Sequence, residues 1–361
     1  MPKSFVFVNL CFKMVNEEAT KEPLSGLSLK GRILETLRRE PGVSFSGESL
    51  AASLGVSRVA VWKQAKALLA AGYPLEVGAG GYVYQKTPPL SGGDDFLYPW
   101  EFGERESFFH HLASTDSTMN RAAELAAQGY PAGTVITAGE QTAGRGRNGH
   151  PWASRQGGLF FTLLERPRLC AADYFRVSLA FQIACARALT EICGKPVRLR
   201  WPNDFYAEGR KIAGLLTEFH AEGDRLSWIS LGLGVNVNNA PHSREAANCA
   251  GLAGRPLSRQ EVLLAILAEW EPLKKETASP SLHREWNALA ACIGERALAT
   301  SAATATAVTG GKGKRKTPKA PQGDPLASGT FMGIDRQGRG LIKGEKLFSF
   351  NPGGVSFSFQ R

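Results

Sequence analysis

The sequence predicts a multidomain α+β protein with an N-terminal winged helix-turn-helix, a central mixed α/β domain and a small C-terminal β domain. Three patterns predict these parts. Residues 28–86 have the pattern of three helices followed by a hairpin, residues 105–291 alternate between strand and helix patterns, and short β-like runs return at 329–360. A chain of 361 residues is long enough for two or three domains, each with its own core.

The composition indicates a soluble protein of a reducing compartment. Hydrophobic residues make up 43% of the chain and charged residues 21%, and no apolar run is long enough to span a bilayer. The six cysteines are scattered, without a CxxC pair or a Cys/His grouping at zinc spacing. We therefore expect a cytoplasmic protein with no membrane partner, reduced thiols and no protein metal site.

Three segments lack the pattern of a folded domain. Residues 1–27 have a short apolar patch without a cleavage site after it, so we expect a flexible leader and not a signal peptide. Residues 87–104 begin with turn formers and are predicted to be a linker. Residues 301–328 contain few large apolar residues, which predicts a disordered basic insert. Because much basic charge lies in this insert, the net charge of +10 is weak evidence for DNA binding.

The N-terminal unit has the local signals of a helix-turn-helix. Apolar residues in 29–40 share one helical face, SGESLAASLG is a second helix that Gly55 ends, and Ser57 is a good N-cap for a third helix. Gly72 can end this third helix in the left-handed conformation. The following YPLEVGAGGYVY alternates around glycines, as a two-stranded wing does.

The third helix of such a unit enters the major groove of DNA with its N-terminal end. The residues predicted to contact DNA are Ser46, Ser57, Arg58, Val59, Trp62, Lys63 and Lys66. A winged helix that contacts other proteins is the alternative, because seven basic against four acidic residues in 28–85 is only a modest excess.

The densest chemistry lies in GTVITAGEQTAGRGRNGHPWASRQGGLFFTLLE. A predicted strand at 133–139 leads into a glycine-rich loop, and a second strand at 158–164 leaves it. GRGRNG has the spacing GxGxxG, but a strand follows it where a dinucleotide-binding fold needs a helix. The guanidinium groups of Arg145 and Arg147 suit a carboxylate and an α-phosphate. The alternative is an exposed arginine turn.

A second group of candidates follows in VRLRWPNDFYAEGRKIAGLLTEF, where WPND predicts a turn between two strands. Lys211 begins the second strand, from which it can reach a site that neutralises a carboxylate and a phosphate. The alternative is an edge lysine that discourages aggregation. Asp204 can orient a nucleophile or a metal ion, or simply form the turn, and Asn236 can bind a nucleotide or close a turn.

Together these motifs resemble the bifunctional biotin protein ligase and biotin operon repressor family. The resemblance rests on DST, GRGRxG, WPND, KIAGLL and GxN, in this order, between a winged helix and a small β domain. It implies a class II synthetase-like mixed sheet in the centre, an SH3-like β barrel at 292–361 and an ATP contact from GIDRQG at 333–338. Met119 and Arg200 depart from the family pattern, which has asparagine in some members and commonly lysine at these positions.

The resemblance assigns roles to the candidate site residues. The residues implied to bind biotin or biotinyl-adenylate are Ser117, Thr118, Met119, Gln141, Arg145, Gly146, Arg147 and Lys211. The residues implied to form or support the nucleotide side are Trp152, Asn203, Asp204, Gly214 and Asn236. Lys211, Arg145 and Arg147 are the expected catalytic residues, because they would stabilise the developing charge.

The implied reaction uses ATP, biotin and Mg²⁺, forms biotinyl-5′-AMP, and transfers biotin to a lysine of a biotin carboxyl-carrier protein. Operator DNA is the second implied partner, read by a homodimer that adenylate binding promotes. Two other functions stay open from the sequence: a lipoate-type acyl ligase, and a non-enzymatic transcription factor that senses biotin.

Overall fold

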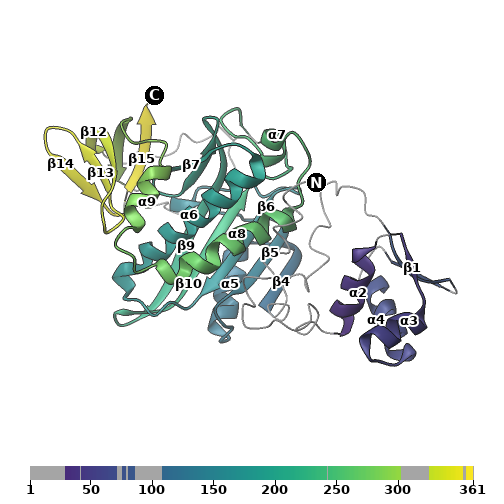
Figure 1. The fold of residues 1–361 in the computed structure, drawn as a ribbon. Helices are drawn as coiled ribbons and strands as arrows, with labels where there is room; N and C mark the ends of the chain where they lie inside the picture. The colour runs from purple at the N-terminus through teal and green to yellow at the C-terminus, as the bar shows by residue number, and fades with distance from the viewer. Residues whose placement is uncertain are drawn as a thin grey trace, which may run out of the picture. The chain divides into compact units, whose positions relative to one another are not determined.

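The chain divides into two compact units in the computed structural model (Figure 1). One unit comprises Met1–Leu90 with Asp94–Phe109, and the other comprises Ser91–Gly93 with His110–Arg361. The structure describes residues 29–40, 42–70, 75–78, 80–85, 108–241, 243–301, 325–352 and 355–360. The leader predicted at 1–27, the linker predicted at 87–104 and Gly72 lie outside these residues.

The described residues of the first unit form three helices and a three-stranded sheet. Its elements are α2 (Leu29–Arg39), α3 (Gly47–Leu54), α4 (Arg58–Ala70), β1 (Ser44–Phe45), β2 (Leu75–Gly78) and β3 (Gly81–Tyr84). The strand order is β1-β3-β2, and both pairings are antiparallel. The three predicted helices and the predicted hairpin are confirmed.

Short polar caps define the turn between α3 and α4. The hydroxyl of Ser46 accepts a hydrogen bond of 2.9 Å from the N–H of Ser49 at the start of α3. Gly55 ends the same helix with φ 67°, a left-handed conformation that favours glycine. The hydroxyl of Ser57 accepts from the N–H of Ala60 at 3.1 Å, as expected of an N-cap. Local sequence therefore sets the direction of α4.

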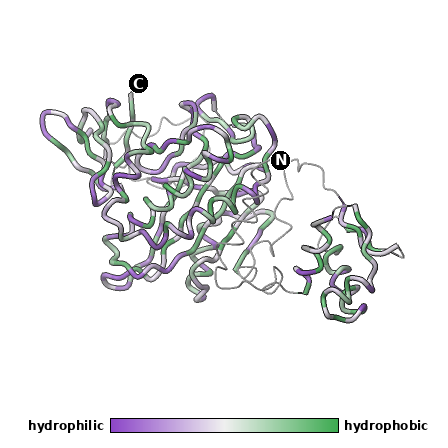
Figure 2. Tube along the Cα trace, in the orientation of Figure 1, coloured by the Kyte–Doolittle hydropathy of each residue, from purple (hydrophilic) through white to green (hydrophobic). Residues whose placement is uncertain are grey.

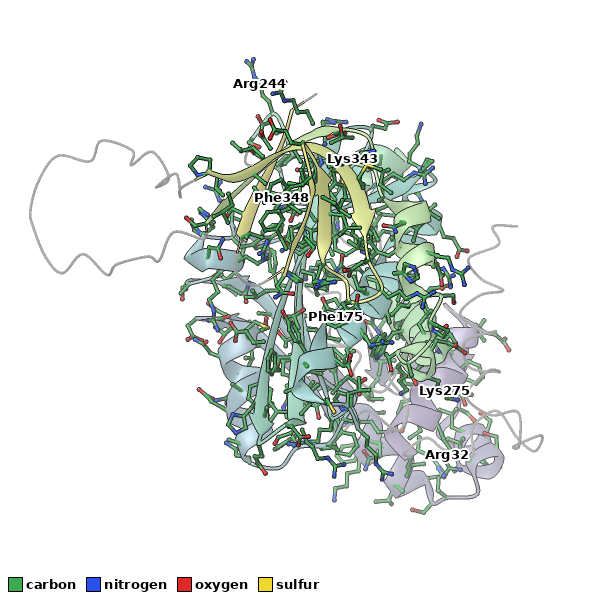
Figure 3. The ribbon with its side chains drawn as sticks, turned by 90° about the vertical axis from the view of Figure 1, so that its left-hand side faces the viewer. Arg32, Phe175, Arg244, Lys275, Lys343 and Phe348 are labelled. Atoms are coloured by element: carbon green, nitrogen blue, oxygen red, sulfur yellow. The ribbon has the colours of Figure 1, made fainter. Side chains whose placement is uncertain are left out.

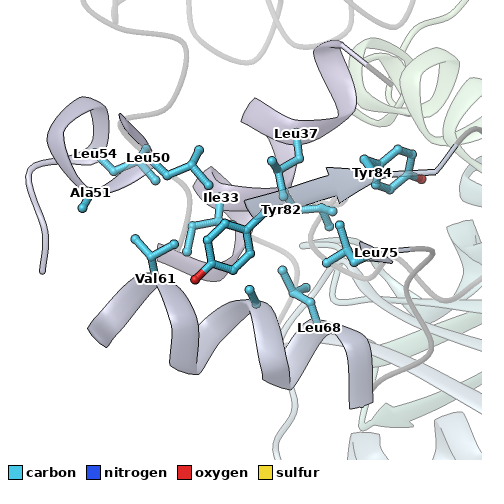
Figure 4. Close-up of a cluster of buried hydrophobic side chains, with 12 residues drawn as sticks. Ile33, Leu37, Leu50, Ala51, Leu54, Val61, Leu68, Leu75, Tyr82 and Tyr84 are labelled. Atoms are coloured by element: carbon cyan, nitrogen blue, oxygen red, sulfur yellow. The ribbon is translucent and has the colours of Figure 1, made fainter. Parts of the chain in front are cut away.

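One apolar core holds these elements together (Figure 4). It is built from all three helices and the hairpin, and its side chains include Ile33, Leu37, Leu50, Val61, Leu68, Leu75, Tyr82 and Tyr84. Val61, Ala65 and Leu68 of α4 are fully buried in it. Their spacing places them on one face of α4, so the opposite face of this helix is left to solvent.

A seven-stranded sheet forms the centre of the second unit, in the order β4-β5-β6-β10-β9-β8-β7 (Figure 1). Its strands are β4 (Phe109–Thr115), β5 (Thr134–Gln141), β6 (Leu159–Glu165), β7 (Val197–Arg200), β8 (Asp204–Ala207), β9 (Arg210–Glu222) and β10 (Arg225–Val235). The pairings from β5 to β7 are all antiparallel. Because short turns join β7 to β8, β8 to β9 and β9 to β10, this part of the sheet contains no parallel ladder.

Helices cover both faces of this sheet. They are α5 (Thr118–Ala127), α6 (Tyr174–Cys193), α7 (Cys249–Ala253), α8 (Arg259–Leu273) and α9 (Leu282–Leu289). On β6, Thr162 bonds to Thr118 of α5, whereas the ring of its neighbour Phe161 lies 6.3 Å from that of Phe181 on α6. Because successive strand residues point to opposite faces, α5 and α6 lie on opposite sides of the sheet. Figure 2 shows hydrophobic residues along these elements and hydrophilic residues at many turns.

A five-stranded antiparallel sheet follows, in the order β14-β13-β12-β11-β15. Its strands are β11 (Arg296–Ser301), β12 (Pro325–Ile334), β13 (Gly340–Lys343), β14 (Leu347–Phe350) and β15 (Val355–Gln360). The rings of Phe350 on β14 and Phe357 on β15 lie 5.7 Å apart, so the two outer strands bring side chains together. The described residues thus form a curved sheet in which β14 and β15 are not paired.

The insert predicted at 301–328 is shorter than expected at both ends. Ser301 ends β11 and residues 325–328 begin β12, while residues 302–324 lie outside the described part of the chain. The prediction of disorder is wrong for these end residues, because Ala327 pairs with Ala299 and Pro325 pairs with Thr300. The hairpin of β11 and β12 therefore forms around the insert.

Aromatic side chains join the small sheet to the central one. The ring of Trp201, after β7, lies 4.4 Å from that of Phe357, and its Nε1–H donates to the carbonyl of Gly338 at 3.3 Å. Phe175, labelled in Figure 3, lies against Gly338, where an added Cβ would come within 2.5 Å of the ring. These contacts fix β15 beside the central sheet. No described helix is long and apolar enough to cross a membrane.

Candidate functional site

One cavity of about 490 Å³ brings together most of the residues predicted from the sequence. The predicted residues that line it are Ser117, Thr118, Met119, Gln141, Arg145, Gly146, Arg147, Trp152, Asn203, Asp204, Lys211 and Gly214. They come from the start of α5, the end of β5, the β5–β6 loop, the β7–β8 turn and the strands β8 and β9. Asn236 is the one predicted pocket residue that does not line it.

A network of neutral polar groups forms the β5 end of the cavity. Oε1 of Gln141 accepts hydrogen bonds from the N–H and the hydroxyl of Thr118, at 2.8 and 3.1 Å. Nε2 of Gln141 donates to the hydroxyl of Ser154 at 2.8 Å, and the hydroxyl of Thr162 donates to that of Thr118 at 2.9 Å. These bonds fix the orientation of each group, so this end suits an uncharged polar group of a ligand.

Glycines form the floor of the cavity because large side chains lie directly above them. A Cβ at Gly232 would come within 2.4 Å of Sδ of Met119, and one at Gly234 within 2.4 Å of Nε1 of Trp152. A Cβ at Gly214, which pairs with Gly234 across β9 and β10, would lie 3.1 Å from the indole. Trp152 is thereby seated flat near the sheet, as a surface on which a planar ring can stack.

Lys211 projects into the middle of the cavity from β9. Its Nζ lies 2.7 Å from Oδ1 of Asp204 and 5.3 Å from the centre of the Trp152 ring. The N–H of Lys211 donates to the carbonyl of Glu245 at 2.8 Å. This bond holds the backbone of Lys211 on the side that does not face β8. Because β9 is an internal strand between β8 and β10, the alternative of a protective edge lysine is wrong.

Arg145 is tied to the sheet by its side chain. Its guanidinium donates to the carboxylate of Glu218 at 3.2 and 3.3 Å, and to Oδ1 of Asn120 at 2.6 Å. About two thirds of the Arg145 side chain is buried, since its exposed fraction is 32%. Arg145 is therefore not part of an exposed arginine turn.

Arg147 is tied instead to the C-terminal strands. Its Nη2 donates to the carbonyl of Pro352 and to that of Val355, the latter at 2.9 Å. The neighbouring Asn148 donates to the hydroxyl of Ser356 at 3.0 Å. Burial lowers the pKa of Arg147, partly offset by the negative charge of Asp204. Arg145 thus connects the β5–β6 loop to β9, and Arg147 connects the same loop to the start of β15.

Several residues at the site carried no local sequence signal. Asn120 and Glu218 hold Arg145, and Ser356 and Phe357 of β15 line the cavity. β15 lies about two hundred residues from the loop in sequence, so only the fold brings them together. The turn at 333–338, expected to contact ATP, does not line the cavity, because Gly338 is seated on Phe175 instead.

Asn236 has a supporting position behind β10. It is 1% exposed, its Nδ2 donates to the carbonyl of Ala247 at 3.2 Å, and its Oδ1 accepts from Nδ2 of Asn239 at 3.0 Å. The carbonyl of Lys211 accepts from the N–H of Ala247 at 2.9 Å. Asn236 therefore holds the segment that flanks Lys211.

The exposed face of α4 carries most of the residues predicted to contact DNA. Arg58, Lys63 and Lys66 are exposed, as are two apolar side chains, Val59 at 74% and Trp62 at 53%. Nζ of Lys66 lies 6.0 Å from the centre of the Trp62 ring. Large apolar side chains are rarely left this open on a helix, so the face suits contact with another surface.

Comparisons with known proteins agree with both halves of this description. A model of the "Biotin/lipoate A/B protein ligase family" matches residues 111–236, and a model described as "HTH domain" matches residues 31–83. The "Bifunctional ligase/repressor BirA" of Bacillus subtilis is 32% identical over 254 residues, which cover 68% of this chain and 78% of that protein. The "Biotin--[acetyl-CoA-carboxylase] ligase" of Paracoccus denitrificans is 29% identical over 64% of this chain and 93% of that protein.

A solved structure is similar as well. The biotin protein ligase from Aquifex aeolicus, in complex with biotin and ATP, is 27% identical with a TM-score of 0.54 and covers 70% of this chain and 99% of that one. Three findings agree on the family: the N-terminal helix-turn-helix unit, the central domain and the length shared with the Bacillus protein. This chain belongs to the family of bifunctional biotin protein ligases and repressors.

Proposed function

We propose that this protein is an ATP-dependent biotin protein ligase that also represses transcription in response to biotin. The observation that carries the enzymatic part is that one cavity holds a neutral polar end, a flat indole and, between them, the ammonium group of Lys211. Biotin has a neutral polar ring at one end and a carboxylate at the other. ATP has a planar base and a polyphosphate, so the two substrates fit the two ends of such a site.

Biotin binds with its ureido ring at Gln141, Thr118 and Ser117. The amide of Gln141 and the hydroxyl groups around it offer both donors and acceptors, which a ureido group needs. Met119 and the floor glycine beneath it supply the apolar wall for the ring sulfur and the chain. The carboxylate then reaches Lys211. Gly146 lets the loop close over this chain.

The adenine ring stacks on Trp152 above Gly214 and Gly234, and Asn203 and Asp204 border the ribose and phosphates. Support comes from the fit of the indole to these glycines, since an added Cβ would lie 2.4 Å from the indole at Gly234 and 3.1 Å from it at Gly214. Asn203 is already committed at Nδ2 to the carbonyl of Leu215 at 2.6 Å, so it shapes the turn while its oxygen remains available. Asn236 acts only by supporting the segment behind Lys211.

In the first step an oxygen of the biotin carboxylate attacks the α-phosphorus of ATP. The bond from this phosphorus to the β-phosphate oxygen breaks, and pyrophosphate leaves with the electron pair. Lys211 neutralises the carboxylate and the α-phosphate as they approach, and Arg145 and Arg147 close the loop over them. Exclusion of water protects the mixed anhydride of biotinyl-5′-AMP from hydrolysis.

Mg²⁺ accompanies ATP in this proposal. No group of three His, Cys, Asp or Glu side chains that could hold a metal ion occurs among the described residues. Asp204 is a carboxylate on the cavity wall, and Mg²⁺ in nucleotide sites is held mainly by phosphates and water with one or two carboxylates. The ion would neutralise charge on the polyphosphate, and Asp204 would be its protein ligand.

In the second step a lysine amine of a biotin carboxyl-carrier protein attacks the acyl carbon of the adenylate. An amide forms, AMP leaves with the electron pair of the acyl–oxygen bond, and the amine loses a proton. Asp204, released from Lys211 when the phosphate binds, is the carboxylate placed to accept it. The experiment is direct: mix protein, biotin, ATP and a carrier domain, and measure the carrier's mass increment.

The same experiment separates the other candidate functions. An increment with lipoate and none with biotin would assign a lipoate-type ligase. Binding of biotin without any increment would leave a biotin-sensing transcription factor. The names of the similar proteins favour biotin over lipoate.

The remaining assignments extend the proposal to the whole chain. The winged helix at 28–86 reads operator DNA with α4, and two adenylate-bound chains form the homodimer that a two-fold operator requires. The ligase domain occupies 105–291. Residues 292–361 form an SH3-like barrel, a closure supported by the ring contact between Phe350 and Phe357. A cytoplasmic location fits the free cysteines among the described residues.

A further inference from the structure

Arg200 lines the cavity at its β7 side, outside the set of residues assigned above. Strand register places Arg200 opposite Asp204, Asp204 opposite Gly214, and Gly214 opposite Gly234. These four residues form one row across four strands. Since neighbouring strands lie about 4.8 Å apart, the backbone of Arg200 is about 10 Å from that of β9, which carries Lys211.

The guanidinium of Arg200 is held in a fixed plane. Its Cζ lies 4.8 Å from the centre of the Tyr206 ring and 5.1 Å from that of Phe359 on β15. Nη2 donates to Oε2 of Glu295 at 2.7 Å, and the side chain is 17% exposed. Contacts from β8, β15 and Glu295 thus orient the group, which limits the entropy lost when a ligand binds.

One donor of this group has no acceptor. The Nε–H of Arg200 is buried and makes no hydrogen bond among the described residues, a costly arrangement for a charged group. A guanidinium donor without an acceptor in a cavity wall suits a ligand with acceptor oxygens.

The arginines and the lysine that line the cavity all have a partner within the protein, and Arg200 differs in having an Nε–H without an acceptor among the described residues. Arg145 faces Glu218, Arg147 faces main-chain carbonyls at 352 and 355, and Lys211 faces Asp204. Arg200 lies on the same cavity wall, two strands from the β9 that carries Lys211, and Ser356 and Ser358 of β15 line the same cavity. A polyphosphate whose α-phosphate lies at Lys211 therefore extends toward Arg200.

We propose that Arg200 binds the β- and γ-phosphates of ATP and stabilises pyrophosphate as it leaves. This inference rests on the proposed ligase function. When the bond between the α-phosphorus and the bridging oxygen breaks, the electron pair stays on the pyrophosphate, and the guanidinium edge of Arg200 neutralises the added charge. Phe359 and Glu295 hold Arg200 in position, so the C-terminal sheet contributes to ATP use through this side chain.

The test compares Arg200→Gln with the full-length wild-type protein in binding and exchange experiments. Titration calorimetry gives the Kd of biotin, AMP, ATP bridged by an α,β-methylene group, and inorganic pyrophosphate. Pyrophosphate–ATP exchange in the presence of biotin gives the KM of pyrophosphate. The matched control is Arg198→Gln, two residues earlier on β7, because Arg198 is exposed, donates to the carbonyl of Ala288 at 3.1 Å and does not line the cavity.

Arg200→Gln is expected to weaken pyrophosphate and the ATP analogue by about tenfold or more, while biotin and AMP change by less than about twofold. Equal weakening of AMP and the ATP analogue, or no weakening of either, would overturn the proposal. If Arg200→Gln lacks a cooperative thermal transition, Arg200→Lys is measured instead. It keeps the charge without the planar fork, and the same selective loss is expected, of smaller size. Absence of biotin-dependent exchange in the wild type would reject the ligase function itself, a separate result.

Discussion

Nε1 of Trp152 lies so close to Gly234 that a Cβ on this residue would come within 2.4 Å of it. The indole can rest on β10 only because residue 234 has no side chain. The position of the proposed adenine-stacking surface is therefore set by a glycine on a strand and not by the loop that carries Trp152.

Gly234→Ala is expected to displace the indole and weaken ATP binding by roughly tenfold, since overpacking of this size costs about 1–3 kcal/mol. Biotin affinity should change much less, because the Gln141 end is remote from the indole. Calorimetric titration with each ligand measures both. Gly78→Ala is the control, because a Cβ there meets nothing within 4 Å. Equal loss of both affinities would argue that the substitution disturbs the whole sheet.

Lys211→Ala should reduce biotin-dependent pyrophosphate release by about a hundredfold or more, the usual effect of removing a group that stabilises developing charge. Lys195→Ala is the control, since Lys195 pairs with Glu208 at 3.2 Å in a comparable ion pair that does not line the cavity. Turnover unchanged in Lys211→Ala would remove this lysine from the mechanism.

Arg147→Gly should release the β5–β6 loop from the carbonyls of Pro352 and Val355. We expect faster dissociation of biotinyl-5′-AMP, by about tenfold, because charge-assisted hydrogen bonds are lost. Stopped-flow displacement of the adenylate measures the rate. Arg121→Gly, which removes an exposed pair with Glu124, should leave it unchanged. An unaltered rate in Arg147→Gly would mean that the loop does not shield the adenylate.

Substitutions on α4 should separate two kinds of DNA contact. Lys63→Ala is expected to weaken binding to all sequences and reduce the salt dependence, as loss of one phosphate contact does. Trp62→Ala should weaken operator more than random DNA. Gel shifts at several salt concentrations, with and without biotinyl-5′-AMP, measure both effects, and Ser53→Ala on α3 is the control. DNA binding equal to wild type in both α4 variants would favour a protein-contact role for this unit.

His110 should make the protein less stable in acid. Burial, and then the positive charge of Arg121, lower the pKa of His110 from its ordinary value of 6.5. The unfolded chain therefore takes up a proton before the folded chain does, and the free energy of unfolding falls as pH drops below 6.5 until the folded pKa is passed. Denaturant unfolding at several pH values should show a smaller fall in His110→Gln. The exposed His220→Gln should behave as wild type.

The winged helix was predictable because its signals are local. Ser57 caps α4 and Gly55 ends α3 within a few residues of each other, so sequence spacing alone defines the turn. Lys211 and the loop arginines were also found from motifs. Their partners were not, because Glu218 and the carbonyls at 352 and 355 lie far along the chain from the loop.

Asn236 is a residue whose role could not be predicted from the sequence. A strand rich in glycine followed by asparagine is typical of a nucleotide contact. In the structure, however, the amide of Asn236 is hydrogen-bonded to the carbonyl of Ala247 and to the side chain of Asn239. Composition near a strand end does not reveal whether a side chain turns toward a ligand or back into its own loop. The direction of the side chain depends on which neighbouring residues are buried, and the fold determines their burial.

Both acceptors of Arg147 at the end of the chain belong to the main chain. Every amino acid supplies a carbonyl oxygen, so exchanging the side chain at 352 or 355 leaves the acceptor in place. A residue inserted or deleted between them would shift both oxygens away from the guanidinium. The hydrogen bonds of Arg147 thus depend on the length of this segment more than on its residue types, although the side chain of Val355 is itself buried. An insertion within 351–355 would therefore be tolerated far less well than a tag after 360.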